Sequence, residues 1–284
     1  MITIAQFKKS YSKAIREGYA AIFAGAGLSK ASGFVEWKEL LNDLAREINL
    51  DVEKESDLVE VAQYYVNEKN SRNEINEKIL NRFITESQES ENIRILSELP
   101  IQIFWTTNYD HLIEDTLKKF GKHVDVKITS ESLATNLSGN DTIVYKMHGD
   151  YTDPAACVII KDDYELYNDK RQLFTTKLQG DLVSKTFLFI GFSFEDPNLK
   201  YILSRIHVLL GKNRRTHYLF LKRIQEDEYE DRMDDYNYDL NKQELRINDL
   251  KRYGIETVLI DSYNQIPTIL SEIKRSTKCK NIFI

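Results

Sequence analysis

The stretch YAAIFAGAGLS, residues 19–29, decides the fold. Its first six residues form a short apolar run, and Gly25 and Gly27 follow at once. A buried run of this length that ends in glycines is typical of a central strand in a parallel sheet. Glycines there let the backbone approach a diphosphate closely, and Ser29 adds a hydroxyl. We therefore predict a strand and a tight turn through Gly25, Ala26 and Gly27; a turn that binds no ligand is an open alternative.

Short apolar runs alternate with helical patterns along the rest of the chain. Further strands are expected at 101–105, 142–147, 186–190, 217–221 and 256–260. Helices are expected at 3–17, 37–48, 198–210 and 264–274. This alternation predicts an α/β fold with a doubly wound, mostly parallel sheet. The polar residues at about 51–99, poor in Gly and Pro, predict a helical insertion, and the acidic residues 224–244 predict a solvated helix or loop.

Asn108 follows the predicted strand 101–105, between Thr107 and Asp110. Ligands of open α/β sheets bind beyond the carboxyl ends of the strands, so the polar residues that follow the strands are expected to converge there. The Asn108 amide could hold a sugar hydroxyl or orient a water. As alternatives, Asn108 caps a helix or forms a turn, and Asp110 caps the helix that begins near His111.

His148 follows the predicted strand 142–147 and precedes Gly149. A histidine titrates near neutral pH, so His148 suits a general base, although a structural role is an open alternative. A second glycine turn, Gly191, Phe192 and Ser193, follows strand 186–190 and could line the other half of the crevice. Asp196 suits the N-cap of the helix that begins at Pro197.

Composition excludes several classes of protein. The formal net charge of −6 gives no general attraction to nucleic acid. The sequence has no apolar window of roughly 20 residues and no secretory signal, so neither a membrane span nor secretion is expected. Two cysteines, Cys157 and Cys279, make neither a disulfide framework nor a four-cysteine zinc site, and a reducing cytoplasm is the expected location. The glycine spacing and the missing P-loop lysine disfavour an ordinary dehydrogenase and a P-loop NTPase.

Taken together, four motifs resemble the sirtuin (SIR2) family over about residues 18–261. They are GAGLS at 25–29, TNYD at 107–110, HG at 148–149 and GFSF at 191–194. The chain departs from sirtuin deacylases because it lacks the paired cysteines of their zinc module. It also has Gly33 to Trp37 where those enzymes have an acidic-aromatic-basic stretch. Both departures argue against a protein deacylase.

The chain resembles more closely the SIR2-like NADases of bacterial anti-phage defence, in particular effectors of the Thoeris system. This resemblance rests on KMHGD at 146–150, KDDY at 161–164 and the run from GDLVSKT at 180–186 through 194. It implies a Rossmann-like domain of the SIR2 type without a zinc module or metal. It also implies hydrolysis of NAD+ to nicotinamide and ADP-ribose, depletion of cellular NAD+, and a homo-oligomer. In those effectors a SLOG-type domain that senses a cyclic nucleotide follows the NADase domain.

On this resemblance, residues 1–276 form the catalytic domain, and 277–284 form a tail at which the sensor would begin. Asn108 orients the ribose or the water, and His148 is the general base. The residues expected to bind NAD+ are Gly25, Ala26, Gly27, Leu28, Ser29, Thr107, Asp110, Gly191, Phe192, Ser193 and Asp196. Two alternatives stay open: an NAD-dependent deacylase or ADP-ribosyltransferase, and a non-catalytic module that senses NAD+.

Overall fold

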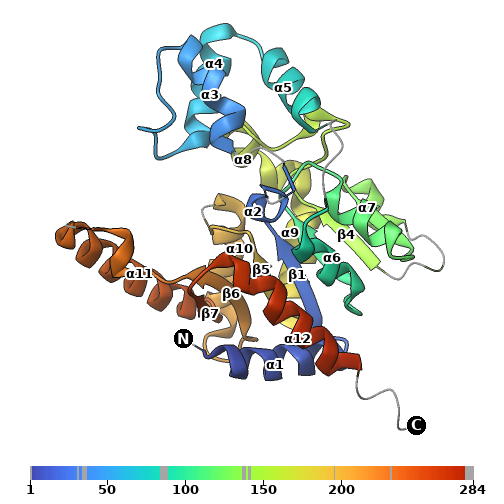
Figure 1. The fold of residues 1–284 in the computed structure, drawn as a ribbon. Coiled ribbons are helices and arrows are strands. Elements are labelled where there is room, and N and C mark those ends of the chain that lie inside the picture. The colour runs from blue at the N-terminus through green and yellow to red at the C-terminus, as the bar shows by residue number, and fades with distance from the viewer. Residues whose placement is uncertain are drawn as a thin grey trace.

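A single parallel sheet forms the centre of the protein, as a computed structural model shows (Figure 1). The structure describes residues 2–30, 32–33, 37–83, 89–135, 139, 142–194, 196–230 and 232–278. Within them, seven parallel strands are arranged in the order β3-β4-β2-β1-β5-β6-β7. The strands are β1 (Ala20–Ala24), β2 (Ile103–Thr106), β3 (Val124–Lys127), β4 (Thr142–Lys146), β5 (Thr186–Ile190), β6 (His217–Lys222) and β7 (Ile255–Ile260). The predicted doubly wound α/β fold is confirmed.

The sheet winds outward in both directions from β1, which lies at its centre. All five residues of β1 are buried, and Ile22 is in register with Phe104 of β2 and Leu188 of β5. A strand covered on both faces must be apolar throughout, which explains why residues 19–24 read as an unbroken apolar run. The loops that follow β1, β2 and β5 therefore meet at one edge of the sheet.

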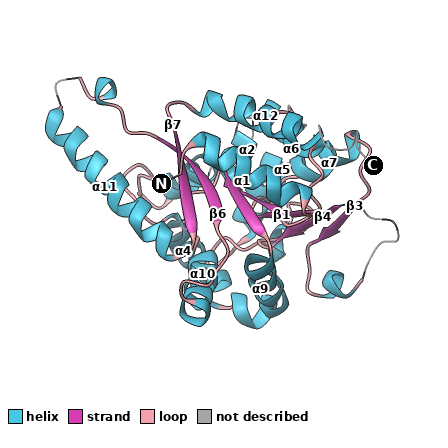
Figure 2. Cartoon of the chain, turned by 90° about the horizontal axis from the view of Figure 1, so that it is seen from below, coloured by secondary structure: helices cyan, strands magenta, loops and turns pink. Residues whose placement is uncertain are grey.

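Helices cover both faces of the sheet (Figure 2). On one face, α1 (Ile4–Arg16), α6 (Glu91–Glu98), α7 (Leu112–Lys119) and α12 (Ile266–Lys278) pack on a core that includes Ile22. On the other face, α9 (Tyr167–Ser184) and α10 (Pro197–Leu210) pack on a core that includes Phe23. Successive residues of β1 thus supply opposite cores, as expected for a strand.

Three helices form a separate lobe beyond the carboxyl end of β1, at the top of Figure 1. They are α3 (Trp37–Glu47), α4 (Leu58–Lys69) and α5 (Asn73–Phe83). The described part of the predicted helical insertion at about 51–99 contains α4, α5 and α6 (Glu91–Glu98), but α6 packs against α7 and α12 on the sheet instead of in the lobe. The short helix α2 (Ala26–Lys30) follows β1, and α8 (Lys161–Glu165) lies against α4.

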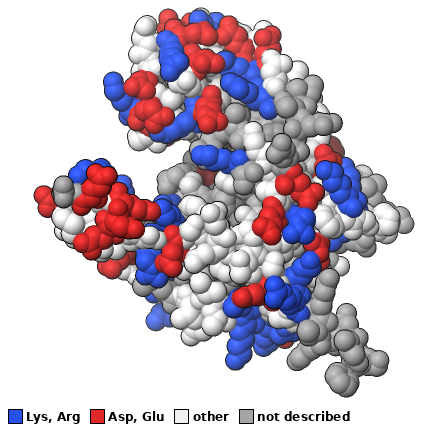
Figure 3. All heavy atoms as spheres, viewed as in Figure 1, with Lys and Arg blue, Asp and Glu red and all other residues white. Residues whose placement is uncertain are grey.

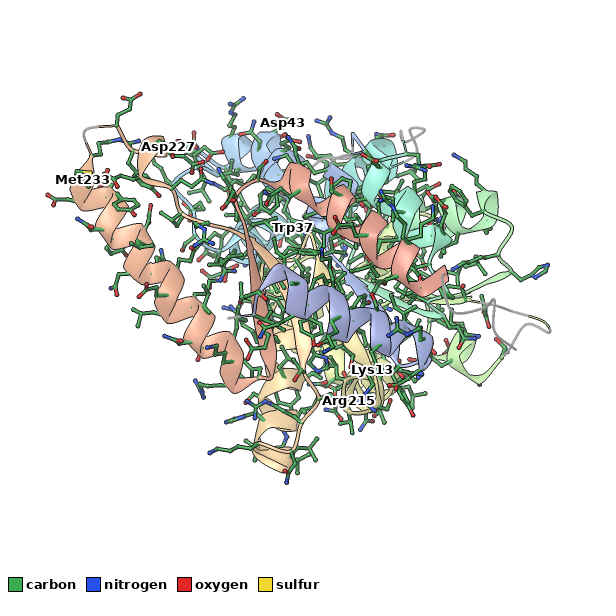
Figure 4. All side chains as sticks on the ribbon, turned by 60° about the horizontal axis from the view of Figure 1, so that its bottom comes forward. Lys13, Trp37, Asp43, Arg215, Asp227 and Met233 are labelled. Atoms are coloured by element: carbon green, nitrogen blue, oxygen red, sulfur yellow. The ribbon has the colours of Figure 1, made fainter. Side chains whose placement is uncertain are left out.

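The acidic segment 224–244, predicted as a solvated helix or loop, includes the first twelve residues of an exposed helix. Helix α11 (Met233–Arg252) projects from the body, and acidic side chains gather over its outer part (Figure 3). Asp227 and Met233 lie at the outer end of this arm (Figure 4), and only Ile247 and Leu250 of the helix are buried. Among the described residues, no helix is long and apolar enough to cross a membrane. Of the predicted tail at 277–284, residues 277–278 belong to the end of α12 and residues 279–284 lie outside the described residues, as does the segment 34–36.

Candidate active site

Asn108 lies in the loop after β2 and is held by three hydrogen bonds. Its backbone N–H donates to Thr106 Oγ1 at 2.9 Å, and its Nδ2 donates to the Gly25 carbonyl at 3.1 Å and to Ser29 Oγ at 2.8 Å. Only 7% of Asn108 is exposed. Because both amide hydrogens are engaged within the protein, the carbonyl oxygen is the part of the amide that a ligand can use. The loops after β1 and β2 therefore converge as predicted.

A pocket opens beside Asn108, between the sheet and the helical lobe. The ends of β1 and β2 supply its polar wall, and α3 and α5 supply an apolar wall. Such a pocket, largely apolar with a few convergent polar groups, is typical of small-molecule sites. The described residues that line it are Ala26, Ser29, Trp37, Leu40, Phe83, Thr107, Asn108, Tyr109 and Asp110. Five of the residues predicted from the sequence thus lie around one pocket.

Asp110 is a buried carboxyl group in this pocket. Its Oδ1 accepts the Leu112 N–H at 2.9 Å, and its side chain is also hydrogen-bonded to Ser29. Asp110 therefore supports the first turn of α7 from the position before its N-cap, which is His111, and it also lines the pocket. Burial raises the pKa of this carboxyl group, although the nearby Lys146 charge opposes the shift.

The two glycine turns pack directly against each other. Gly25 donates to the Ile190 carbonyl at 3.0 Å, and Gly27 donates to the Gly191 carbonyl at 2.9 Å. A Cβ atom on Gly25 would lie 2.4 Å from the Gly191 oxygen. The glycines are therefore required where the turns after β1 and β5 touch, whether or not a diphosphate binds. The Leu28 side chain, predicted among the binding residues, lies in the hydrophobic core, so only its backbone can face a ligand.

Phe192 and Ser193 lie in the turn after β5. The Phe192 ring packs against Phe23 with ring centroids 5.0 Å apart, and Ser193 is exposed. The Ser193 carbonyl accepts a hydrogen bond from Arg246 of α11. This contact connects the projecting helix to the second glycine turn.

His148 occupies a separate, buried position after β4. His148 as a whole is 2% exposed, and its ring packs edge-on against Tyr164 and Tyr167, with centroid distances of 5.5 and 6.1 Å. Its Nε2 lies 3.1 Å from Asp196 Oδ2, but their relative orientation is not that of a hydrogen bond. His148 is not among the described residues that line the Asn108 pocket.

Tyr109 links the two parts of the site. It lines the pocket, and its hydroxyl group donates to the Val158 carbonyl at 2.7 Å. The Val158 N–H in turn donates to the His148 carbonyl at 2.9 Å. The structure thus places the two predicted catalytic residues in neighbouring compartments, with Tyr109 and Val158 connecting them.

Lys146, the last residue of β4, was not predicted as a site residue. Its fully buried ammonium group donates to the carbonyls of Tyr109 at 3.0 Å and Asp110 at 2.6 Å. It also pairs with Glu114 Oε1 at 3.1 Å and Asp150 Oδ2 at 2.5 Å. Lys146 therefore fixes the backbone of the loop that carries Asn108. A lysine that ends a buried strand was the available signal, because a buried ammonium group requires partners.

His111, Glu114 and Asp150 place potential metal ligands within 4.8 Å of one another. The Lys146 ammonium group is paired with two of them and supplies the positive charge that a cation would bring. Burial would raise the pKa of Asp150, but the hydrogen bond from His111 and the Lys146 charge outweigh burial and hold this pKa well below its usual range. The pKa of Glu114 is raised by burial. The cluster is therefore an internal ion network rather than a good metal site.

The chain is similar to several known proteins. A family model described as "SIR2-like domain" matches residues 102–246. The chain is 51% identical over 270 residues to "NAD(+) hydrolase ThsA" of Cytobacillus dafuensis. The aligned region covers 93% of this chain and 54% of that protein. The chain is 50% identical over 283 residues to the protein of the same name from Enterococcus faecium, covering 97% and 59%.

A more distant relative is "Defense-associated sirtuin 2" of Bacillus subtilis. The identity is 27% over 210 residues, which cover 71% of this chain and 20% of that protein. The chain thus spans little more than half the length of the NAD(+) hydrolases that it matches.

Proposed function

This chain belongs to the SIR2-like family, and we propose that it hydrolyses NAD+ to nicotinamide and ADP-ribose. One observation carries the proposal: relatives that are 48–51% identical across nearly the whole chain are named NAD(+) hydrolases. The Asn108 pocket supports it, because a polar wall at the carboxyl ends of β1 and β2 suits a nucleotide.

The chemistry requires the site to stabilise a developing positive charge on the ribose. Nicotinamide leaves NAD+ as a neutral molecule, so the departing ring needs no proton. An oxocarbenium-like ribose forms, and water adds to it. We assign Asn108 to this step, since its fixed carbonyl oxygen can orient the ribose or the attacking water.

The rest of NAD+ would lie along the two glycine turns. The turn of Gly25, Ala26 and Gly27, together with the Ser29 hydroxyl, would contact the diphosphate or the nearby ribose. The N–H groups of Gly25 and Gly27 already donate to Ile190 and Gly191, so these two glycines would contribute by the close approach of their backbone. Gly191 and Ser193 would contact the adenosine half. Leu28 would contribute through its backbone only, because its side chain is buried in the core.

We assign His148 the role of general base toward the water or a ribose hydroxyl. In this structure its ring lies outside the pocket, so the role requires either movement of the wall at Tyr109 or a water that relays the proton. Hydrogen bonds in unliganded active sites are often poorly aligned and improve when the substrate binds. The position of His148 is therefore compatible with this assignment.

At the level of the cell, we propose that the whole protein depletes NAD+ in anti-phage defence. The name of the B. subtilis relative supports the defence role. We further propose a cytoplasmic homo-oligomer in which a second domain senses a cyclic nucleotide. The greater length of the NAD(+) hydrolase relatives is consistent with a further domain in the whole protein.

The test is to incubate the purified chain with NAD+ and quantify nicotinamide and ADP-ribose by chromatography. The matched variants are His148→Ala and His123→Ala, since His123 is exposed and precedes the edge strand β3. We expect equal amounts of both products from the wild type and His123→Ala, and none from His148→Ala. Intact NAD+ that remains bound to the wild type would instead favour a sensing module. Consumption only in the presence of an acylated peptide would favour a deacylase.

A further inference from the structure

His148 and Asp196 form a buried pair of a basic and an acidic side chain. Nε2 of His148 lies 3.1 Å from Oδ2 of Asp196, and their side chains are 3% and 8% exposed. His148 Nε2 has no hydrogen-bond partner among the described residues. A small rotation of the ring would align its N–H with the carboxylate, because the two atoms are already at hydrogen-bonding distance.

The Asp196 carboxylate is held in place by the backbone of α10. It is the N-cap residue of this helix, and its Oδ1 accepts the Leu199 N–H at 2.7 Å. Pro197 follows at the first helical position, where its fixed φ angle suits the helix. One carboxylate oxygen thus anchors the side chain to the helix, and the other faces His148.

Asp196 places a negative charge directly beside the His148 ring, whereas the other titratable groups near the ring are neutral, paired or bonded to backbone carbonyls. Burial raises the pKa values of the phenols of Tyr109, Tyr164 and Tyr167, so these groups stay neutral near neutral pH. Asp163, next to Tyr164, is neutralised by Arg72 at 2.6 Å. Arg171, near Tyr167, donates to the backbone carbonyls of Ile128 and Ala156.

We propose that Asp196 is the positioning residue of His148, and that it orients the imidazole and stabilises its protonated form during turnover. A carboxylate that accepts a hydrogen bond from the Nε2–H group leaves Nδ1 free to take up a proton, which is the arrangement that a histidine base requires. This inference rests on the proposed function. It assigns Asp196 a role in the reaction beyond its cap and its predicted contact with NAD+.

The test separates the charge of Asp196 from its role as a helix cap. Asp196→Asn retains the cap but removes the charge, because asparagine caps helices about as well as aspartate. Asp196→Ala removes both, and Asp57→Asn makes the same change at the exposed N-cap of α4. The measurements are kcat and KM for nicotinamide release from pH 5 to 9, with urea unfolding of each variant.

For Asp196→Asn we expect kcat to fall about tenfold to a hundredfold with little change in KM, because general-base catalysis typically contributes about a hundredfold or more. The acid limb of its kcat profile should move to lower pH, since imidazolium loses its negatively charged neighbour. Asp57→Asn should match the wild type. An Asp196→Asn variant with wild-type kcat and acid limb would overturn the proposal, even if Asp196→Ala were unstable and inactive.

A second measurement keeps this test independent of the proposed activity. In protein with isotope-labelled histidine, the ring signals of His148, identified by their loss in His148→Ala, are followed by NMR across the same pH range. The His148 signal should titrate at lower pH in Asp196→Asn than in the wild type. Absence of nicotinamide release from the wild type would count against the proposed function, whereas an identical His148 titration in both proteins would overturn the role of Asp196.

Discussion

Gly191 and Leu28 approach so closely that a single added carbon would collide with the backbone. A Cβ atom on Gly191 would lie 2.2 Å from the Leu28 nitrogen, and Gly191 has φ of +63°. Two separate constraints therefore require glycine at this position, the positive φ and the contact between the turns after β1 and β5. The constraint belongs to the fold itself, so it holds with or without a nucleotide.

Gly191→Ala should destabilise the protein more than the same substitution at Gly121. Gly121 also has a positive φ, +77°, but no atom of the described residues lies within 4 Å of its added Cβ. Gly121→Ala should therefore cost only the backbone term of about 1–2 kcal/mol. The overlap at Gly191 should add about 1–3 kcal/mol. Urea unfolding of both variants measures the difference, and equal destabilisation would show that the turns separate easily.

Asn108→Ala should lower nicotinamide release by about a hundredfold or more while NAD+ binding changes little. The amide acts on the reacting ribose or water, so its loss should affect the transition state more than the ground state. Single-turnover kinetics and calorimetric titration with NAD+ measure the two effects separately. A variant that binds NAD+ tenfold more weakly and keeps its kcat would assign Asn108 to binding alone.

The sequence predicted the central strands well because their burial demands unbroken apolar runs. Strand β3 was missed for the opposite reason. The two buried residues of this edge strand, Asp125 and Lys127, are charged and form an ion pair at 2.8 Å. Their charges conceal the alternation of buried and half-buried residues that identifies a strand.

At the site, the convergence of Asn108 with Ser29 follows from strand polarity and was predicted. The separation of His148 from the Asn108 pocket was not. It depends on the packing of Tyr164 and Tyr167 against the His148 ring. These tyrosines lie in a different segment of the chain from His148, and no local sequence pattern predicts contacts between the two segments. The role of Lys146 was hidden similarly, because its partners lie on the loop after β2, on α7 and after β4.

Lys146→Met should destabilise the protein by about 3–5 kcal/mol, because it leaves the buried Glu114 carboxylate without its cation. Adding Glu114→Gln should recover part of this loss. Lys38→Met, which removes an exposed ion pair with Glu53, should cost at most about 1 kcal/mol. Urea unfolding of the four proteins checks these values. Because the Lys146 ammonium group supplies the positive charge of this cluster, EDTA should leave the Tm of the wild type unchanged. A marked fall in Tm with EDTA would show that a metal ion, and not Lys146 alone, balances the carboxylates.

The ion pair of His111 with Asp150 should make stability depend on pH. The hydrogen bond with Asp150 raises the pKa of His111, and burial opposes the shift. A raised pKa stabilises the fold fully below the unfolded value of about 6.5, and this stability is lost as pH rises through the folded value. The free-energy difference between the wild type and His111→Gln should therefore shrink from pH 5.5 to pH 9. Urea unfolding across this pH range tests the prediction, with His123→Gln as the control variant. A free-energy difference between wild type and His111→Gln that stays constant with pH would exclude the linkage.

Arg72→Ala should loosen the attachment of the helical lobe to the segment that covers His148. Arg72 lies just before α5 and bonds to Asp163 of α8 at 2.6 Å and to the Cys157 carbonyl at 2.6 Å. Asp163 in turn accepts the N–H groups of Ile159 and Ile160. Hydrogen bonds to charged groups contribute about 1.5–3 kcal/mol each, so amide exchange should accelerate in residues 157–165. Lys161→Ala removes an exposed pair that also joins α8 to the lobe, Lys161 with Glu60 of α4, and should change exchange little. Equal effects of the two variants would mean that apolar packing, not Arg72, holds the lobe in place.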